Sequence, residues 1–173
     1  LTLDDGSGLT RMTPGTHSKA WVAIAVPQDQ ALTDKQLLNL SQSGEAQMVQ
    51  VILPATDCAL QQIALKQALE KLQNTTTLVA GIGPGAAQAW EWLSTQTDDK
   101  AHAISVDFNV ERPGCATPLP KSAAHGHWSV AWNDNPDDAS AAFVRDQPNA
   151  ETSISDYDIH PQQVLKDQLT QAR

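Results

Sequence analysis

The chain has 173 residues, a length that suits one domain with a single hydrophobic core. Hydrophobic residues make up 40% of it and charged residues 18%, which is typical of a folded protein and excludes general disorder. Twenty acidic residues outnumber 11 basic ones, so the net charge of -9 disfavours contact with nucleic acid or an anionic lipid surface. The sequence contains no apolar stretch of the roughly 20 residues that a transmembrane helix needs.

Short apolar runs alternate with helical stretches along the chain. Residues 1–18 are polar, with at most a short edge strand, and we expect them to lead into a single domain over 19–173. Strands are expected at 21–26, 48–53, 76–80, 101–108, 127–132 and 151–155. Helices are expected at 33–42, 59–73, 86–97, 136–144 and 161–172. This alternation predicts a doubly wound α/β fold with a mostly parallel sheet of about six strands.

A glycine-rich turn follows the third of these strands. Its sequence, Gly81-Ile82-Gly83-Pro84-Gly85, has the frame of a nucleophile elbow, G-x-S-x-G, in which the outer glycines permit a sharp strand-to-helix turn. Gly83 stands in the place of the serine, and a residue without a side-chain oxygen cannot be deprotonated or acylated. The sequence therefore predicts an α/β-hydrolase-like domain with a degenerate elbow, and no cofactor is expected.

The same turn has two other interpretations. Gly81, Gly83 and Ala86 fit a dinucleotide fingerprint, and Asp107, at the end of the next strand, would bind the ribose. Against this, Pro84 removes one backbone N–H from a turn that would have to present such donors to phosphate. A purely structural turn between a strand and a helix also needs glycine, whether or not anything binds there.

Four segments, in order along the chain, carry a resemblance to a known family. They are Asp57-Cys58 at a helix start, 78–86 around the glycine turn, 103–108 on the next strand, and Cys115. Over 20–115 the chain resembles the amino-terminal domain of the VirJ/AcvB family of bacterial virulence proteins. The resemblance implies a periplasmic or secreted protein in which this domain is a non-catalytic accessory, a fragment of a longer two-domain chain. Its partner would be a second α/β-hydrolase domain with a serine elbow, acting on an ester such as aminoacylated phospholipid.

The order of a hydrolase triad points to two further positions. The acid is expected after the strand at 127–132 and the histidine after the last strand, which selects Asp134 and His160 as relict triad positions. Turn chemistry around Asp134 and a helix start after His160 explain both residues equally well without catalysis. An active hydrolase with a nucleophile outside the elbow would use Ser105 or Ser129, although a hydroxyl within a strand is usually packed and hydrogen-bonded.

Two pairs of aromatic residues have simpler explanations. His125 and His127 lack a third ligand at a supporting spacing, so no metal site is expected. Trp90 and Trp92 lie about 200° apart around a helix, so both cannot point fully inward. One of them is expected to face a partner domain or the solvent.

Two cysteines follow predicted strands that end at the same edge of the sheet. Cys58 comes after the strand at 48–53 and Cys115 after the strand at 101–108. In the hydrolase strand order two strands separate them, a gap of roughly 14 Å at ~4.8 Å per strand. Residues 109–114 can cross that gap, passing above Gly83. We therefore predict a Cys58–Cys115 disulfide and an oxidising compartment; two buried free thiols in a reducing cytosol are the alternative.

Overall fold

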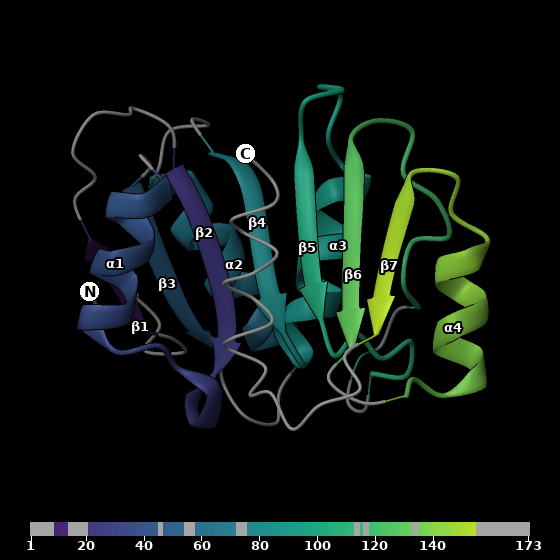
Figure 1. The fold of residues 1–173 in the computed structure, drawn as a ribbon, viewed down its shortest axis with the longest axis horizontal. Coiled ribbons are helices and arrows are strands. Elements are labelled where there is room, and N and C mark those ends of the chain that lie inside the picture. Colours follow the sequence, from purple (N-terminus) through teal and green to yellow (C-terminus); the bar gives the residue numbers. More distant parts are fainter. Residues whose placement is uncertain are drawn as a thin grey trace.

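The computed structural model describes residues 9–13, 21–44, 47–53, 58–71, 76–112, 115, 118–132 and 135–154. Seven strands form one sheet in the order β1-β3-β2-β4-β5-β6-β7 (Figure 1). They are β1 (Leu9–Thr13), β2 (Trp21–Pro27), β3 (Gln47–Leu53), β4 (Thr76–Ile82), β5 (His102–Val106), β6 (His127–Trp132) and β7 (Ala150–Ile154). The helices are α1 (Asp34–Gly44), α2 (Cys58–Lys71), α3 (Pro84–Ser94) and α4 (Asp138–Arg145), with one 3-10 turn at Gln28–Gln30.

The expected doubly wound, mostly parallel sheet is confirmed. Strands β2 to β7 pair in parallel, and they fall at the six expected positions. The short edge strand allowed for in the lead-in is β1, which runs antiparallel to β3. The helix expected at 161–172 lies outside the described residues. Among the described residues, no helix has both the length and the apolar character needed to traverse a bilayer.

Several element boundaries differ from expectation by one to three residues, and two of the differences have a local reason. Strand β5 stops at Val106, because Asp107 adopts a positive φ of 57°, which is incompatible with extended backbone. Helix α3 begins at Pro84, two residues earlier than expected. A proline suits the first position of a helix because its fixed φ is already helical and its missing N–H would have no partner there.

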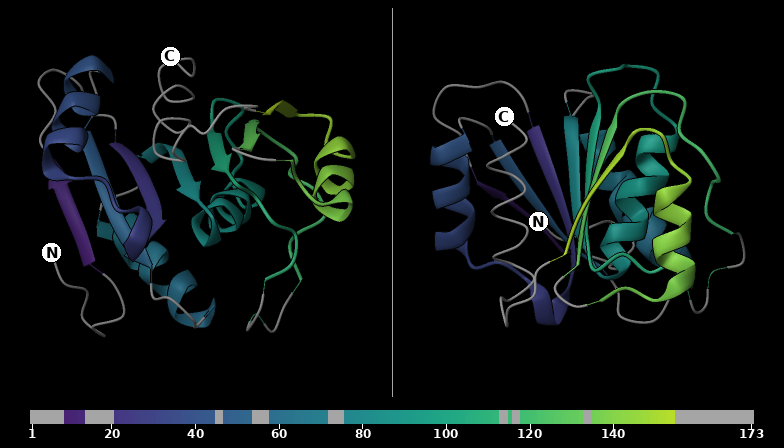
Figure 2. Two further views of the ribbon diagram at one scale, coloured as in Figure 1. Left: turned by 60° about the horizontal axis from the view of Figure 1, so that its bottom comes forward. Right: turned by 45° about the vertical axis from the view of Figure 1, so that its right-hand side comes forward.

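Helices cover both faces of the sheet. Figure 2 shows α1 on one side and α3 and α4 on the other. The core is divided accordingly: Leu37 of α1 packs with Ile24 and Ile104 on one face, while α2, α3 and α4 enclose the larger cluster on the opposite face. This two-sided cover is the reason that the central strands β2 to β6 are largely apolar.

Aromatic rings fill the larger cluster. The rings of Trp90 and Trp128 lie 4.1 Å apart between centroids, and Phe143 packs edge-on against both. Each buried indole has a partner: Trp90 Nε1 donates to the carbonyl of Pro120 at 2.8 Å, and Trp128 Nε1 donates to Ser105 Oγ at 2.9 Å. Trp90 is fully buried, so the tryptophan expected to face outward is Trp92, which is only partly buried.

Candidate functional site

The turn between β4 and α3 has the backbone shape of a sharp elbow. Gly83 adopts φ 59° and ψ -118°, a left-handed conformation that favours glycine over any residue with a side chain. Its N–H donates to the carbonyl of Val106 at 3.0 Å, and its own carbonyl accepts from Ala86 N–H at 3.0 Å. The turn is therefore held to β5 on one side and to the first turn of α3 on the other.

The two outer glycines are required by close packing. A Cβ atom on Gly81 would overlap the carbonyl oxygen of Gly85, and a Cβ atom on Gly85 would overlap the carbonyl oxygen of Ala25 in β2. A Cβ atom on Gly83 would meet no described atom within 4 Å, its chain neighbours aside. The elbow thus tolerates only glycine at its two outer positions, whereas its centre has room for a side chain at the cost of a positive φ.

Pro84 removes a second component of acyl-transfer chemistry. In a nucleophile elbow, the residue after the nucleophile supplies a backbone N–H to the oxyanion hole. Pro84 occupies that place as the first residue of α3, and proline has no N–H. The missing donor matters for acyl transfer as well as for phosphate binding, so this turn lacks both a nucleophile and an oxyanion donor.

A buried glutamine holds the loop that supplies the other oxyanion donor in hydrolases, the loop between the neighbouring strand and its helix. Gln50 of β3 is fully buried. Its Oε1 accepts from Leu32 N–H at 2.6 Å and its Nε2 donates to the carbonyl of Leu32 at 3.1 Å. This pair fixes the segment between β2 and α1. Sequence reasoning gave Gln50 no role, although a lone amide within the apolar run of β3 was a visible signal.

The predicted disulfide is present. Cys58, the first residue of α2, is bonded to Cys115, and their Cα atoms lie 5.0 Å apart. Between β5 and Cys115, Val110 N–H donates to Ser140 Oγ of α4 at 3.0 Å. Arg112 forms an ion pair with Glu91 of α3, so the segment from 109 to 115 makes contacts with all three helices on this face.

The described contacts of this segment lie along α3 rather than at Gly83, and residues 113 and 114 lie outside the described part of the chain. Glu91, the partner of Arg112, lies eight positions after Gly83, about 12 Å along α3 at the helical rise per residue. Gln62 of α2 donates to the same carboxylate at 3.0 and 3.2 Å. The described contacts therefore connect Arg112, Glu91 of α3 and Gln62 of α2, while a Cβ atom on Gly83 would meet no described atom within 4 Å, its chain neighbours aside.

Of the four other nucleophile and triad candidates, the structure describes two, Ser105 and Ser129. Asp134 and His160 lie outside the described residues. Ser105 is fully buried; its hydroxyl donates to the carbonyl of Ala86 at 2.7 Å and accepts from Trp128, as expected of a packed hydroxyl. Ser129 is different, because its Oγ lies 2.8 Å from His102 Nε2.

His102 has a perturbed acid-base equilibrium. Burial lowers the pKa of His102 below 6.5, the nearby His127 lowers it further, and the carboxylate of Glu151 opposes both. The rings of the two histidines lie side by side on β5 and β6, with centroids 6.3 Å apart.

His125 has a different partner and pairs with Asp99 at 2.7 Å on the surface. Within the described part of the chain, no group of three His, Cys, Asp or Glu side chains is arranged to hold a metal ion.

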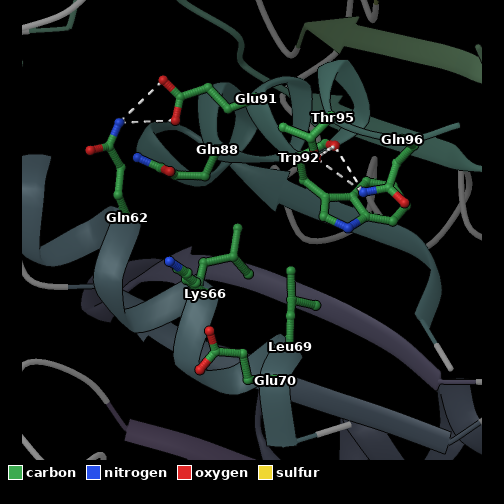
Figure 3. Close-up of a pocket in the computed structure, with 10 residues that line it drawn as sticks. Gln62, Lys66, Leu69, Glu70, Gln88, Glu91, Trp92, Thr95 and Gln96 are labelled. Atoms are coloured by element: carbon green, nitrogen blue, oxygen red, sulfur yellow. Dashed lines mark hydrogen bonds between the residues drawn. The ribbon is translucent and has the colours of Figure 1, made fainter. Parts of the chain in front are cut away.

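A cavity of about 450 Å³ lies between α2 and α3 (Figure 3). Its walls come from both helices and combine apolar with amide and charged side chains. They are Gln62, Leu65, Lys66, Leu69, Glu70, Gln88, Glu91, Trp92, Thr95 and Gln96. Neither the elbow glycines nor Asp107 belong to these walls, so the cavity is separate from the glycine turn.

No family model and no curated protein sequence match the chain. Solved structures do match. An alpha-beta serine hydrolase homologue from Coxiella burnetii has a TM-score of 0.66 at 17% identity, covering 95% of this chain and 89% of its own. Est1E from Butyrivibrio proteoclasticus has a TM-score of 0.68 at 9% identity, and the match covers 98% of this chain and 95% of Est1E. A membrane phospholipase A described as a bacterial virulence factor has a TM-score of 0.62 at 11% identity, and the match covers 90% of this chain and 76% of the phospholipase chain. The chain therefore has the α/β-hydrolase fold.

Proposed function

We propose that this chain is a non-catalytic α/β-hydrolase-like domain that supports a separate catalytic domain. One observation carries the proposal: at the elbow, Gly83 provides no nucleophile and Pro84 provides no oxyanion N–H. The rest of the turn keeps its shape, because Gly81 and Gly85 allow the close approach of α3 to β4 and β2. A retained elbow without its reacting groups is consistent with an architecture kept for packing or binding.

The resemblance to the VirJ/AcvB family gives this domain its context. On that basis the domain, taken as 19–173, is an accessory in a periplasmic or secreted protein. Its catalytic partner is a second hydrolase domain of the same protein, acting on an ester such as aminoacylated phospholipid. The Cys58–Cys115 disulfide supports an oxidising compartment. Reading the gene beyond Arg173 tests the two-domain organisation: we expect an α/β-hydrolase domain with an intact G-x-S-x-G, and a stop codon there would contradict it.

Covalent labelling tests the non-catalytic assignment directly. The purified chain, incubated with a fluorophosphonate probe and analysed by intact mass, should remain unmodified because the elbow holds no hydroxyl. An active serine esterase in the same buffer is the positive control for the probe. Stoichiometric modification of the chain would overturn the proposal, and peptide mapping would then identify the serine responsible.

The enzyme alternative has one observation in its favour, the 2.8 Å contact between Ser129 Oγ and His102 Nε2. A histidine beside a hydroxyl is the first requirement of an activated nucleophile. Both residues nevertheless lie toward the amino ends of β5 and β6, whereas hydrolase nucleophiles lie at the carboxyl edge. Labelling that disappears in Ser129→Ala and persists in Ser105→Ala would favour this alternative.

Dinucleotide binding through Gly81, Gly83 and Asp107 remains the third alternative, and no described contact favours it. Gly83 N–H is already donated to Val106, and Pro84 has none, so neither can serve a phosphate. Calorimetry with NAD, NADP or FAD should show no binding at micromolar concentrations. Binding that is abolished by Asp107→Ala would contradict this expectation.

A further inference from the structure

We propose that the cavity between α2 and α3 binds a small neutral molecule that presents an amide or ester carbonyl oxygen on an apolar body. The site uses neither the elbow nor the proposed partner domain, so it is independent of the function proposed above. Its volume of about 450 Å³ falls within the range of small-molecule sites. Three kinds of observation support it: the apolar walls, an unpaired buried amide, and the balance of charge.

The apolar walls come from both helices. Leu65 and Leu69 contribute from α2, and Trp92 contributes from α3. Leu65 is buried, while Leu69 and Trp92 are partly buried against the core and so leave apolar surface facing the cavity. An aromatic ring with two branched aliphatic side chains is a surface that favours an apolar body of similar size.

The amide of Gln88 sets the polar requirement. Gln88 is only 3% exposed and lines the cavity, yet its buried Nε2 has no hydrogen-bond partner among the described residues. Figure 3 shows this side chain extending from α3 toward Gln62 of α2. A buried donor left unpaired is unfavourable, and because Gln88 lines the cavity, a molecule bound there can supply the partner. The missing partner is therefore an acceptor, and a ligand carbonyl oxygen supplies one.

The charges around the cavity favour a neutral ligand. The carboxylate of Glu91 is already engaged by Arg112 and by the amide of Gln62. Lys66 and Glu70, both exposed, carry opposite formal charges one helical turn apart on α2. The formal charges of these side chains cancel. Arg112 neutralises Glu91 without being one of the cavity walls, so a charged ligand gains no advantage over a neutral carbonyl there.

A matched pair of probes tests the proposal on the whole chain. N-butylbenzamide has a neutral carbonyl on an apolar body, and N-butylaniline has the same body without the carbonyl. In NMR titrations, N-butylbenzamide should shift the indole N–H signal of Trp92, the amide signals of Gln88 and the methyl signals of Leu65 in a saturable manner. One recovered hydrogen bond should make it bind roughly five-fold more tightly than N-butylaniline.

Variants separate the two contributions. Gln88→Leu keeps the volume and removes the amide, so the preference for N-butylbenzamide should disappear while both probes still bind. Trp92→Ala should weaken both probes by about ten-fold, since it removes an aromatic wall. Ile63→Ala, at an exposed position of α2 outside the cavity, is the control and should change neither affinity.

Several outcomes would overturn the proposal. Equal affinity of the wild-type chain for the two probes would refute the carbonyl requirement, and this comparison needs no variant to fold. If the NMR signals of the cavity residues do not shift at any concentration of N-butylbenzamide up to its solubility limit, the site itself is refuted. Tighter binding of benzoate than of N-butylbenzamide would refute the neutral-ligand assignment.

Discussion

Cys58 and Cys115 are joined although the strands that precede them are not neighbours. Their Cα atoms lie 5.0 Å apart, whereas β3 and β5 are separated in the sheet by β2 and β4. Cys115, which follows β5 in the sequence, therefore lies beside the first residue of α2. On the way Arg112 pairs with Glu91 of α3, so a covalent link and an ion pair fasten the same segment to two helices.

Removing the disulfide should destabilise the fold substantially. The bridge closes a loop with a sequence separation of 57, and the loop-closure entropy argument gives about 4 kcal/mol for a loop of this size. We expect Cys58→Ala/Cys115→Ala to lower the free energy of unfolding by about that amount, measured by urea denaturation against the oxidised wild type.

Intact mass gives the complementary measurement for the bridge. Denatured but unreduced protein treated with iodoacetamide should gain no alkyl group, and the same protein after reduction should gain two. Two groups on the unreduced protein would show that the thiols are free. That result would also remove the main physical support for an oxidising compartment.

Substitutions at two elbow glycines should have very different effects. Gly83→Ala places a methyl group in open space, so its cost is the positive φ alone, about 1–2 kcal/mol. Gly81→Ala forces a methyl group into the carbonyl of Gly85 and should cost at least about 3 kcal/mol or prevent folding. Thermal or urea unfolding of both variants measures the difference; equal losses would mean that the turn is not packed as described.

Restoring the serine alone should not restore chemistry. Gly83→Ser provides a hydroxyl in the elbow, but Pro84 still supplies no N–H to an oxyanion. We expect the folded variant to show no esterase activity above that of Gly83→Ala on a p-nitrophenyl ester, with Gly83→Ala as the matched control for the strain at this position. A rate that follows the introduced serine would indicate that oxyanion donors from elsewhere suffice.

The sequence was sufficient for the strands but not for the polar contacts between elements. Each apolar run from β2 to β6 predicted a strand because burial on both faces leaves a continuous pattern, and the shared edge of β3 and β5 made the disulfide predictable. The Arg112–Glu91 pair and the Gln50–Leu32 contacts were not predicted. They join residues 21 and 18 positions apart, and their meeting depends on helix rotation and loop path, which no local pattern encodes.

Breaking the Arg112–Glu91 pair should loosen the segment without unfolding the chain. The Arg112 and Glu91 side chains are 8% and 18% exposed, so Arg112→Met leaves a largely buried carboxylate with only Gln62 beside it among its described partners. We expect a loss of about 1–3 kcal/mol in unfolding free energy. Arg112→Met/Glu91→Leu should recover much of that loss, since it removes both charges together. If the double variant were no more stable than the single one, the ion pair would not be the origin of the loss.

The stability of the fold should depend on pH through His102. Burial lowers the pKa of His102 in the folded chain, His127 lowers it further, and Glu151 partly opposes them. In the unfolded chain the pKa returns to about 6.5, so below that pH the unfolded state binds more protons at this position than the folded state does. The contribution of neutral His102 to the free energy of unfolding should therefore be fully present above about pH 6.5. It should be lost as the pH decreases toward the lower pKa of the folded state.

A variant that cannot titrate isolates this contribution. His102→Gln keeps a group able to hydrogen-bond the hydroxyl of Ser129 but carries no titrating ring. We expect its unfolding free energy to change less between about pH 7.5 and pH 5.5 than that of the wild type. His125→Gln, at a more exposed position paired with Asp99, is the matched control for the loss of a histidine. If the unfolding free energies of the wild type and His102→Gln changed equally with pH, the burial of His102 would not disfavour its protonation in the folded chain.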